Sequence, residues 1–510
     1  MATAKERFTT LNGKRDQVLQ RGRDCSDITI PALMPPEGAD ENTRLSTPYQ
    51  SLGSRGVNNL ASKLRLALFP PGNPFFRFQI DSETIEVISE DDPGVADQIE
   101  GVMQELENDA LNELEQGADS VILHATIKQL IVVGNVLLHM PKSESSRIFR
   151  LQNYVVVRDA SGNWYEIVAQ EKVSKYTLPD DAKGLLVTNE KDSDEDVTIY
   201  THVRKKGDKA EWYQEIDENK VPNSDGRSDY DNCPYIPLRW AALENENYGR
   251  GHCEEYLGDL RSLEDLSKDM VVFAAAAAKV IFLDRPNSTT DLKAVQEAES
   301  GEFVEGNIED IGVLQVDKFH DFQVVKALID DLSLRISHAF LLTTGTVRNA
   351  ERVTAEEIRM QAQELEDVLG GVYTVLAAEL QQKVVRRLIE RLKAKGRFPS
   401  LPTGTVNPVI VTGFEALGRG HELNKLRQYF ADGQAMYGEE FIKEFDPRAV
   451  ADRLATHHNV DVDALKKTDE QKQQEAAMQQ QAMMLEKATG PIAGAAGAAI
   501  GTGVAAAAST

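Results

Sequence analysis

Few residue clusters in this chain have the types that catalysis or metal binding would need. The adjacent His457 and His458 could each offer a ring nitrogen to a metal, but neighbouring positions on a helix point about 100° apart. The glycine turn Gly418-Arg419-Gly420 follows no buried parallel strand, so it is typical of a turn. The phosphate-loop, HExxH, GxSxG and EF-hand patterns are absent. We therefore expect no catalytic residue, no metal ligand and no cofactor, and we predict that the chain is not an enzyme.

The best candidates for binding lie in the segment TTGTVRNAER, residues 343–352. This segment is polar and rich in hydroxyls, and its glycine gives the backbone freedom. Arg352 could serve the helix and not a ligand, because it could form an ion pair with Glu356, its i,i+4 neighbour. Such a pair stabilises a helix by roughly 0.2–0.5 kcal/mol. The candidate residues of the loop are Thr343, Thr344, Thr346, Arg348, Asn349 and Arg352, and Lys326 and Arg335 on the preceding helix are added to them.

A long helix is predicted directly after this loop. Thr354 and Glu357 have the spacing of a capping box, in which each side chain bonds to the other residue's backbone N–H. Apolar residues then recur at helical spacing as far as Leu392. Gly370 and Gly371 interrupt this pattern, and glycines inside a helix are a common cause of a kink. We predict a helix kink at these two residues.

Before the loop, two helical stretches flank a short acidic insert. Apolar periodicity predicts helices over Cys253–Leu283 and Phe319–Leu342, and we expect them to pack side by side as an antiparallel pair. The insert, Asp284–Asp317, contains two predicted strands, Phe303-Val304 and Val313–Val316. It is a plausible docking surface, although an ordinary solvated loop region has the same composition. Its acidic residues include Asp291, Glu297, Glu299, Glu302, Glu305, Glu309 and Asp310.

The first half of the chain alternates helical and extended patterns, which predicts an α+β body. Residues 1–24 are charged and helix-prone, and further helices are expected at residues 58–68, 97–117 and 121–133. Short strands are expected at residues 75–78, 154–158, 164–169, 197–203 and 210–216. After a strand at 406–411, helices are expected at 415–438 and 441–457, and residues 490–510 lack the large apolar side chains of a core.

The composition limits the classes of function. The chain has 510 residues, enough for several domains, and its net charge of −26 argues against a sequence-specific DNA-binding surface. Acidity could reduce the sticking of DNA that passes close by, or it could simply maintain solubility. The three separated cysteines indicate free thiols in a reducing cytoplasm. Neither a signal peptide nor a membrane-spanning run is recognisable.

Six blocks of the sequence together resemble the portal (head-to-tail connector) proteins of short-tailed, podovirus-type bacteriophages. The blocks follow the family's order and cover roughly residues 25 to 430. They are NNLASKLRLALFPPGNPFFRF (58–78), IKQLIVVGNVLLHMP (127–141), CPYIPLRW (233–240), YGRGHCEEYLGDLRSLEDL (248–266), RVTAEEIRMQAQELEDVLGGVY (352–373) and TGFEALGRGHELNKL (412–426).

The resemblance implies a mainly helical α+β portal fold with wing, stem, clip and crown, which forms a ring around a central channel. It divides the chain into an α+β wing (1–252), a stem helix (253–283), a clip (284–317), a second stem helix (318–342) and a channel loop (343–352). A kinked wing helix with its return (353–414), crown helices (415–470) and a low-complexity tail (471–510) follow. The candidates of residues 343–352 would then face DNA, with Lys326 and Arg335 as further channel-facing candidates.

The resemblance also implies the function and the partners. The chain would be a structural subunit of a dodecamer at the capsid portal vertex of the virion, assembled in the host cytoplasm. Double-stranded DNA would pass through it during packaging and ejection without sequence-specific contact. No membrane would be a partner. The terminase large subunit and later a tail adaptor would dock to it, and scaffolding, internal core and major capsid proteins would join it as the ring nucleates the procapsid. The alternative is an internal scaffold or tail adaptor protein without a DNA channel.

Overall fold

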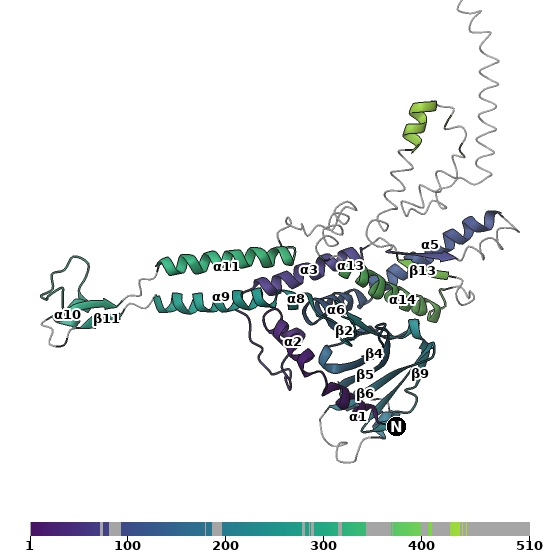
Figure 1. Cartoon of the computed structure of the whole chain (residues 1–510), viewed down its shortest axis with the longest axis horizontal. Helices are drawn as coiled ribbons and strands as arrows, with labels where there is room; N and C mark the ends of the chain where they lie inside the picture. The colour runs from purple at the N-terminus through teal and green to yellow at the C-terminus, as the bar shows by residue number, and fades with distance from the viewer. Residues whose placement is uncertain are drawn as a thin grey trace, which may run out of the picture. The chain divides into compact units, whose positions relative to one another are not determined.

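The computed structural model describes two units of the chain, residues 1–416 and 417–510. The described elements of the first unit are both helices and strands, which confirms the α+β class (Figure 1). In the second unit, residues 429–437 are helical, as expected for that stretch. The described residues are 2–71, 75–80, 93–178, 180–185, 196–277, 281–284, 286, 290–314, 319–342, 369, 371–398, 406–410, 429–438, 441 and 445.

The predicted helical start of the chain is two helices, α1 (Ala4–Asn12) and α2 (Asp16–Asp27). A capping box opens α1, because the Glu6 N–H donates to Thr3 Oγ1 at 3.2 Å and the Thr3 N–H donates to Glu6 Oε2 at 3.1 Å. Helix α1 buries Ala4 and Phe8 on one face of the largest sheet.

The main core forms around α3 (Leu52–Leu68), α5 (Pro93–Gln116), α6 (Asp119–Val133) and α14 (Gln382–Ala394). The α6 helix ends at Gly134, whose φ is 76°. A Cβ on Gly134 would lie 2.4 Å from the Gly251 backbone nitrogen, so only glycine fits this close approach. On α14, the Arg387 guanidinium donates to the Met140 carbonyl at 2.8 Å, which ties this helix to the end of a core strand.

The described residues of the first unit form four antiparallel sheets, one of which is the pair β11 (Ile281–Asp284) and β12 (Ile311–Leu314). In the largest, the strand order is β4-β5-β6-β7-β8, with β9 also on β7. In the second, β2 lies between β10 and β3, and in the third β1 pairs with β13. The bounds are β1 Phe76–Ile80, β2 Asn135–His139, β3 Arg147–Phe149, β4 Tyr154–Arg158, β5 Trp164–Val173, β6 Val197–Lys206, β7 Lys209–Ile216, β8 Asn219–Lys220, β9 Gly226–Asp229, β10 Tyr235–Arg239 and β13 Val406–Ile410; short helical turns are η1 Pro31–Leu33, η2 Leu151–Asn153, η3 Lys175–Thr177, η4 Tyr230–Asn232 and α7 Asp180–Lys183.

The two helices expected to pair are α9 (Leu257–Ala277), preceded by α8 (His252–Glu255), and α11 (Phe319–Ala339). They lie side by side (Figure 1), and the Phe273 and Phe322 ring centroids are 4.4 Å apart between them. The expected packing is therefore confirmed. We call α9 and α11 the helical pair.

The segment between the two helices differs from its prediction in two ways. The first predicted helix was extended too far, because Ile281–Asp284 is strand β11, which pairs antiparallel with β12 (Ile311–Leu314). Phe303 and Val304 are not a strand but part of an irregular loop. A six-residue helix, α10 (Leu292–Glu297), lies between the two strands in sequence. We call residues 281–314 the tip.

The helix that leads into α14 contains an irregular turn. Gly371 begins α13 (Gly371–Leu376), and a π-helical segment, η5 (Ala377–Gln381), joins α13 to α14. Gly370 lies outside the described residues, as do Thr354 and Glu357, so the kink and the capping box stay predictions. Among the described helices, none is both long and apolar enough to cross a membrane.

Candidate functional site: the helical pair and its tip

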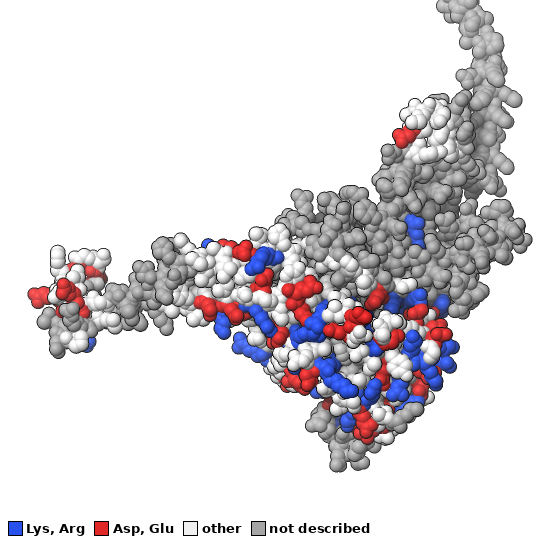
Figure 2. Space-filling view, viewed as in Figure 1, with Lys and Arg blue, Asp and Glu red and all other residues white. Residues whose placement is uncertain are grey.

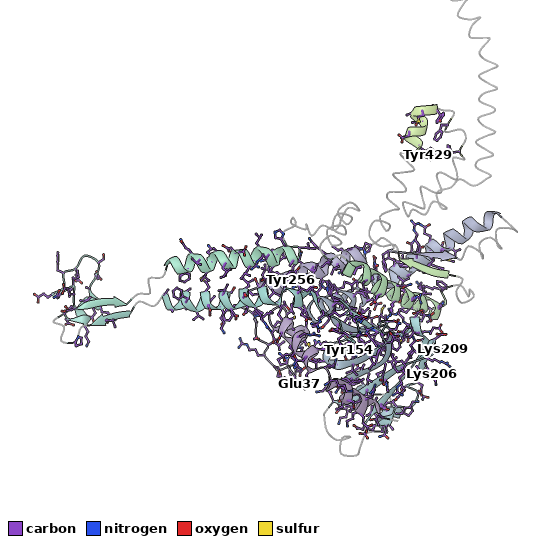
Figure 3. All side chains as sticks on the ribbon, in the orientation of Figure 1. Glu37, Tyr154, Lys206, Lys209, Tyr256 and Tyr429 are labelled. Carbon is purple, nitrogen blue, oxygen red and sulfur yellow. The ribbon has the colours of Figure 1, made fainter. Side chains whose placement is uncertain are left out.

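The helical pair is anchored to the body by an aromatic lock. His252 Nε2–H donates to the Ala339 carbonyl at 3.0 Å, which joins the start of α8 to the end of α11. The Tyr256 and Phe340 rings each lie 5.1 Å from the His252 ring, and Trp240 lies 5.7 Å from it. Tyr256 marks this end of the pair in Figure 3. Burial lowers the pKa of His252, which keeps its imidazole neutral.

The end of α11 is fixed by a second set of contacts, from α3. Leu341 adopts a left-handed conformation with φ 56°, a position where glycine is usual. The Leu342 N–H donates to the Ser337 carbonyl at 2.8 Å, as in a Schellman motif. The Asn59 side-chain amide donates to the Leu341 carbonyl at 2.8 Å and to the Phe340 carbonyl at 3.1 Å. The chain therefore leaves α11 from a fixed point, immediately before Thr343.

The sequence-predicted site residues fall into two groups. Lys326 and Arg335 lie on α11, and both are exposed. Arg335 is already engaged, because its guanidinium lies 3.4 Å from Asp331 and 3.7 Å from Asp259. Within the described part of the chain, Lys326 has no ion-pair partner. The loop candidates lie outside the described residues: Thr343, Thr344, Thr346, Arg348, Asn349 and Arg352.

Apolar side chains of the helical pair stay exposed on this single chain. On α9, Val271 and Val272 are 55% and 57% exposed. On α11, Val324, Leu328 and Leu334 are 70%, 46% and 53% exposed. The inward faces, by contrast, carry the buried Leu263, Leu332 and Ile336. The pair thus has a packed seam and an uncovered apolar surface.

The tip is held together by a polar lock. The Thr290 hydroxyl donates to Asp310 Oδ2 at 3.0 Å and accepts from the Asn307 N–H at 2.9 Å. Asp310 is therefore structural, and it is buried, whereas Asp291 and the glutamates of the tip are exposed. Asp291 also has a structural role, because it accepts the Lys293 N–H at the start of α10. Among the charged atoms of the tip seen in Figure 2, those of carboxylate residues predominate, and the exposed ones are Asp291, Glu297, Glu299, Glu302, Glu305 and Glu309.

The tip also presents two apolar side chains that the sequence analysis missed. Phe303 is fully exposed and Ile308 is 93% exposed, each beside exposed glutamates. The sequence did contain a signal of this exposure, namely single apolar residues among carboxylates. The sequence analysis nevertheless interpreted Phe303 as part of a strand. Single exposed apolar side chains are common on protein surfaces, and only their place among exposed carboxylates on one loop makes these two candidates for binding.

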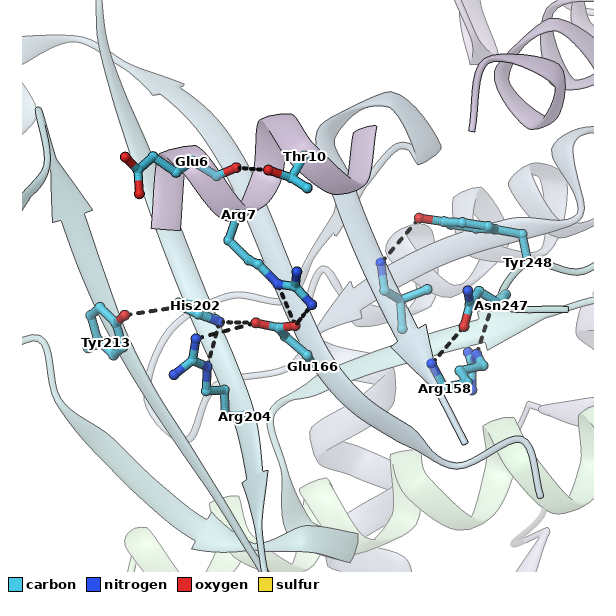
Figure 4. A network of polar contacts seen from close by, with 11 residues as sticks. Glu6, Arg7, Thr10, Arg158, Glu166, His202, Arg204, Tyr213, Asn247 and Tyr248 are labelled. Atoms are coloured by element: carbon cyan, nitrogen blue, oxygen red, sulfur yellow. Dashed lines mark hydrogen bonds and ion pairs between the residues drawn. The ribbon is translucent and has the colours of Figure 1, made fainter. Parts of the chain in front are cut away.

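A polar network on the largest sheet has residue types that catalysis could use (Figure 4). The His202 ring lies between Glu166 Oε1 at 2.7 Å and the Tyr213 hydroxyl at 3.0 Å. The guanidinium of Arg7 bonds to Glu166 Oε2 at 2.7 Å. Burial alone would raise the pKa of Glu166, but the hydrogen bonds from His202 and Arg7 lower it to about 2. His202 and Glu166 are buried, and the bond from Arg7 to Glu166 fastens α1 to the sheet.

The described residues hold no cluster of three or more His, Cys, Asp or Glu side chains suited to a metal ion. The arrangement of the helical pair and the tip instead suits protein contacts, since it combines uncovered apolar surface with exposed charge. The functional candidates that geometry supports are thus the surfaces of the helical pair and the tip.

Comparison with known proteins is consistent with this picture. Residues 1–465 match the family described as "Bacteriophage head to tail connecting protein". The chain is 40% identical over 478 residues to the portal protein of Enterobacteria phage T3, covering 92% of this chain and 89% of that protein. It is 39% identical over 499 residues to the portal protein of Escherichia phage T7, covering 96% and 93%. Against the portal protein of Pseudomonas phage phiKMV, identity is 31% over 470 residues, with 90% and 91% covered.

Solved structures give a more distant match. A chain from the virion of the native gene transfer agent (GTA) particle matches with a TM-score of 0.37 and 11% identity, covering 76% of this chain and 89% of that one. A chain from the neck of the native GTA particle matches with a TM-score of 0.35 and 11% identity, covering 74% and 84%.

Proposed function

The chain belongs to the bacteriophage head-to-tail connecting protein family. On this premise, we propose how the parts of the chain serve the role of a portal subunit in a phage capsid. Copies of the chain form a closed ring, a dodecamer, around a channel at one vertex of the virion. Genomic DNA is packaged and ejected through this channel. The protein is not an enzyme, so the force for packaging comes from a partner motor.

The observation that carries the proposal of a ring is the uncovered apolar surface of the helical pair. Val271, Val272, Val324 and Leu328 are all about half exposed or more, although each would contribute roughly 1.5–3 kcal/mol if fully buried. A cyclic assembly covers such a surface by a head-to-tail contact, in which different faces of neighbouring copies meet. The helical pair is thus the stem, α9 and α11 of adjacent subunits forming its wall.

The loop of residues 343–352 lines the narrowest part of the channel on this proposal. The clamp of Asn59 on the Leu341 carbonyl supports it, since a loop that acts on DNA needs a fixed base. Arg348 and Arg352 then supply short-range attraction to phosphate. Lys326, exposed and unpaired within the described residues, is a further channel-facing cation. Arg335 is a weaker candidate, because it is already paired with Asp331 and Asp259.

The tip is the clip, on which the terminase large subunit docks during packaging and the tail adaptor docks afterwards. Its exposed Phe303 and Ile308 supply apolar anchors, and its exposed glutamates supply charge. Scaffolding, internal core and major capsid proteins contact other parts of the ring, including crown helices within residues 415–470. Assembly takes place in the host cytoplasm.

Electron microscopy of the purified protein tests the ring. A ring with a central hole is expected, and monomers or filaments would contradict the proposal. Deletion of residues 344–350 tests the channel loop separately. Rings should persist in this variant, because the flanking helices carry the packing, while filled heads should lose nuclease-protected DNA faster than wild type. Unchanged retention of DNA would show that the loop does not help to hold packaged DNA in the head.

A further inference from the structure

A groove on the first unit has a charge opposite to that of the whole chain. It lies where the α1–α2 corner meets strand β4 and the loop before α8, and its volume is about 310 Å³. We call it the basic groove. Its lining comprises Leu11, Lys14, Arg15, Gln17, Val18, Arg21, Val156, Glu246, Asn247 and Tyr248.

The walls of the basic groove are firmly held. The Tyr248 hydroxyl accepts the Val156 N–H at 3.2 Å, and Asn247 accepts the Arg158 N–H at 2.7 Å (Figure 4). On the opposite wall, Arg15 is buried, donates to the Leu151 carbonyl at 2.8 Å and lies over the Tyr248 ring at 5.4 Å. The groove is therefore formed before any occupant arrives, which reduces the entropic cost of binding.

Cations outnumber carboxylates among the lining residues, three to one. The single lining carboxylate, Glu246, is already bonded to Arg250 at 3.1 Å. The positive charge of Arg21 is only partly offset by a carboxylate. Its Nε is shielded from solvent without a hydrogen bond, and the nearest carboxylate oxygen, on Glu254, is 3.7 Å away. That oxygen also accepts from Arg250 at 2.6 Å. The groove thus has unused positive charge.

The rest of the lining selects what can bind there. Leu11, Val18 and Val156 place apolar surface beside the cations, so a bare phosphate would leave half of the groove uncovered. An aliphatic or aromatic side chain next to a carboxylate would satisfy both parts. The groove is therefore suited to an acidic peptide segment that also carries an apolar residue.

We infer that the basic groove binds a carboxylate-bearing segment of the neighbouring copy in the ring. This inference rests on the proposed function. With a net charge of −26 per chain, adjacent copies repel one another, and a local surplus of cations in the subunit contact would offset part of that repulsion. Coulomb interactions fall off within about 10 Å at ordinary salt, so the compensating cations must lie in the contact itself.

Charge reversal with a matched control tests the inference. Lys14→Glu with Arg21→Glu should raise the protein concentration needed for half-maximal ring formation at least tenfold, as measured by native mass spectrometry and electron microscopy. The control Lys5→Glu with Lys209→Glu changes the net charge equally at exposed sites outside the groove (Lys209 in Figure 3). If both double variants assemble alike, the inference is wrong.

Two further measurements do not depend on Arg21, whose loss could weaken folding through its pairing with Glu254. Lys14→Glu alone, at an exposed residue, should give a smaller shift in the same direction. A photo-crosslinking residue at Gln17 in otherwise wild-type rings should join an acidic segment of another copy, identified by mass spectrometry. Crosslinks to DNA or to another protein alone, or none, would overturn the inference. Wild-type chains that form no ring would instead contradict the proposed function.

Discussion

At the scale of single residues, buried neutral histidines couple the fold to pH. Burial is the main cause that lowers the pKa of His252, and it lowers the pKa of His139 to about 3, with Arg147 adding to the effect. The His139 imidazole is therefore neutral in the native state at moderately acidic pH, and His252 takes up a proton less readily than a free histidine does. The unfolded chain binds protons there, because a free histidine has a pKa of about 6.5. Acid should thus favour unfolding, starting near that pH.

We expect the free energy of unfolding to fall as the pH drops from 7 to 5. The contribution of His139 should be a loss of about 2 kcal/mol at pH 5, from the linkage between proton binding and stability. His252→Gln, whose amide can still donate to the Ala339 carbonyl, should flatten part of the slope. Thermal unfolding of dilute protein at several pH values measures this. The exposed His338→Gln is the control, and an equal flattening by both variants would contradict the prediction. The buried Glu166, with a pKa lowered to about 2, adds a separate loss only below about pH 4.5.

Phe303 is expected to contribute to docking and not to folding. Its side chain is fully exposed, so Phe303→Ser should change the stability of the chain by no more than about 0.5 kcal/mol. If the ring of Phe303 enters an apolar pocket of the partner, the same variant should weaken binding of the terminase large subunit at least tenfold, about 1.4 kcal/mol. Surface plasmon resonance measures the affinity of the variant for the terminase large subunit. The control is Tyr176→Ser, a change at another exposed aromatic residue. Equal binding of both variants would exclude Phe303 as an anchor.

At the scale of elements, the junction of α11 with α3 is the feature most open to test. The Asn59 amide satisfies two carbonyls at the end of α11, those of Phe340 and Leu341. Asn59→Ala should therefore cost about 1–3 kcal/mol, because the Phe340 carbonyl would lose its side-chain donor, whereas the Leu341 carbonyl keeps a hydrogen bond from Lys63 Nζ at 3.1 Å.

The same variant should speed hydrogen exchange of the last amides of α11, which mass spectrometry can follow. The control is Ser62→Ala on the same helix, since the exposed Ser62 hydroxyl bonds only to the Asn58 carbonyl one turn earlier. If Asn59→Ala and Ser62→Ala exchange at the same rate, the clamp does not hold the end of the helix.

Elements with a strong local pattern were predictable from the sequence. A run of valines before a turn signal gave β4 with its observed bounds, and apolar periodicity gave α6 within two residues of its start. The end of the first long helix was wrong, because an apolar run such as Ile281–Leu283 fits a helix or a strand equally well. Only pairing with β12 decides that it is a strand.

Surfaces assembled from distant segments were not predictable. The basic groove joins Lys14 to Tyr248, and the anchor of α11 joins Asn59 to Leu341, so neither leaves a local pattern in the sequence. The exposure of Phe303 likewise follows from its place in an irregular loop, which the sequence analysis interpreted as a strand. The channel-loop candidates and the kink at Gly370 and Gly371 stay predictions.

At the scale of the whole molecule, assembly must overcome repulsion between acidic copies. Apolar contact is the natural source of that free energy, at about 25 cal/mol per Å² of buried apolar surface. The helical pair offers such a surface on both of its helices, through Val272 on α9 and Leu328 on α11. Folding of the single chain does not depend on these exposed side chains, so assembly and folding can be separated by mutation.

Val272→Asp with Leu328→Asp should therefore abolish rings while the monomer stays folded. Each aspartate would place an unpaired charge in an apolar contact, at a cost of several kcal/mol for every subunit boundary, whereas the exposed position in the monomer tolerates it. Sedimentation velocity should show monomers with wild-type circular dichroism. The control is Val121→Asp on α6, 70% exposed and outside the pair, which should leave rings intact. Rings from the double variant would mean that the helical pair does not form the subunit contact, and loss of rings in both variants would mean that added acidity alone prevents assembly.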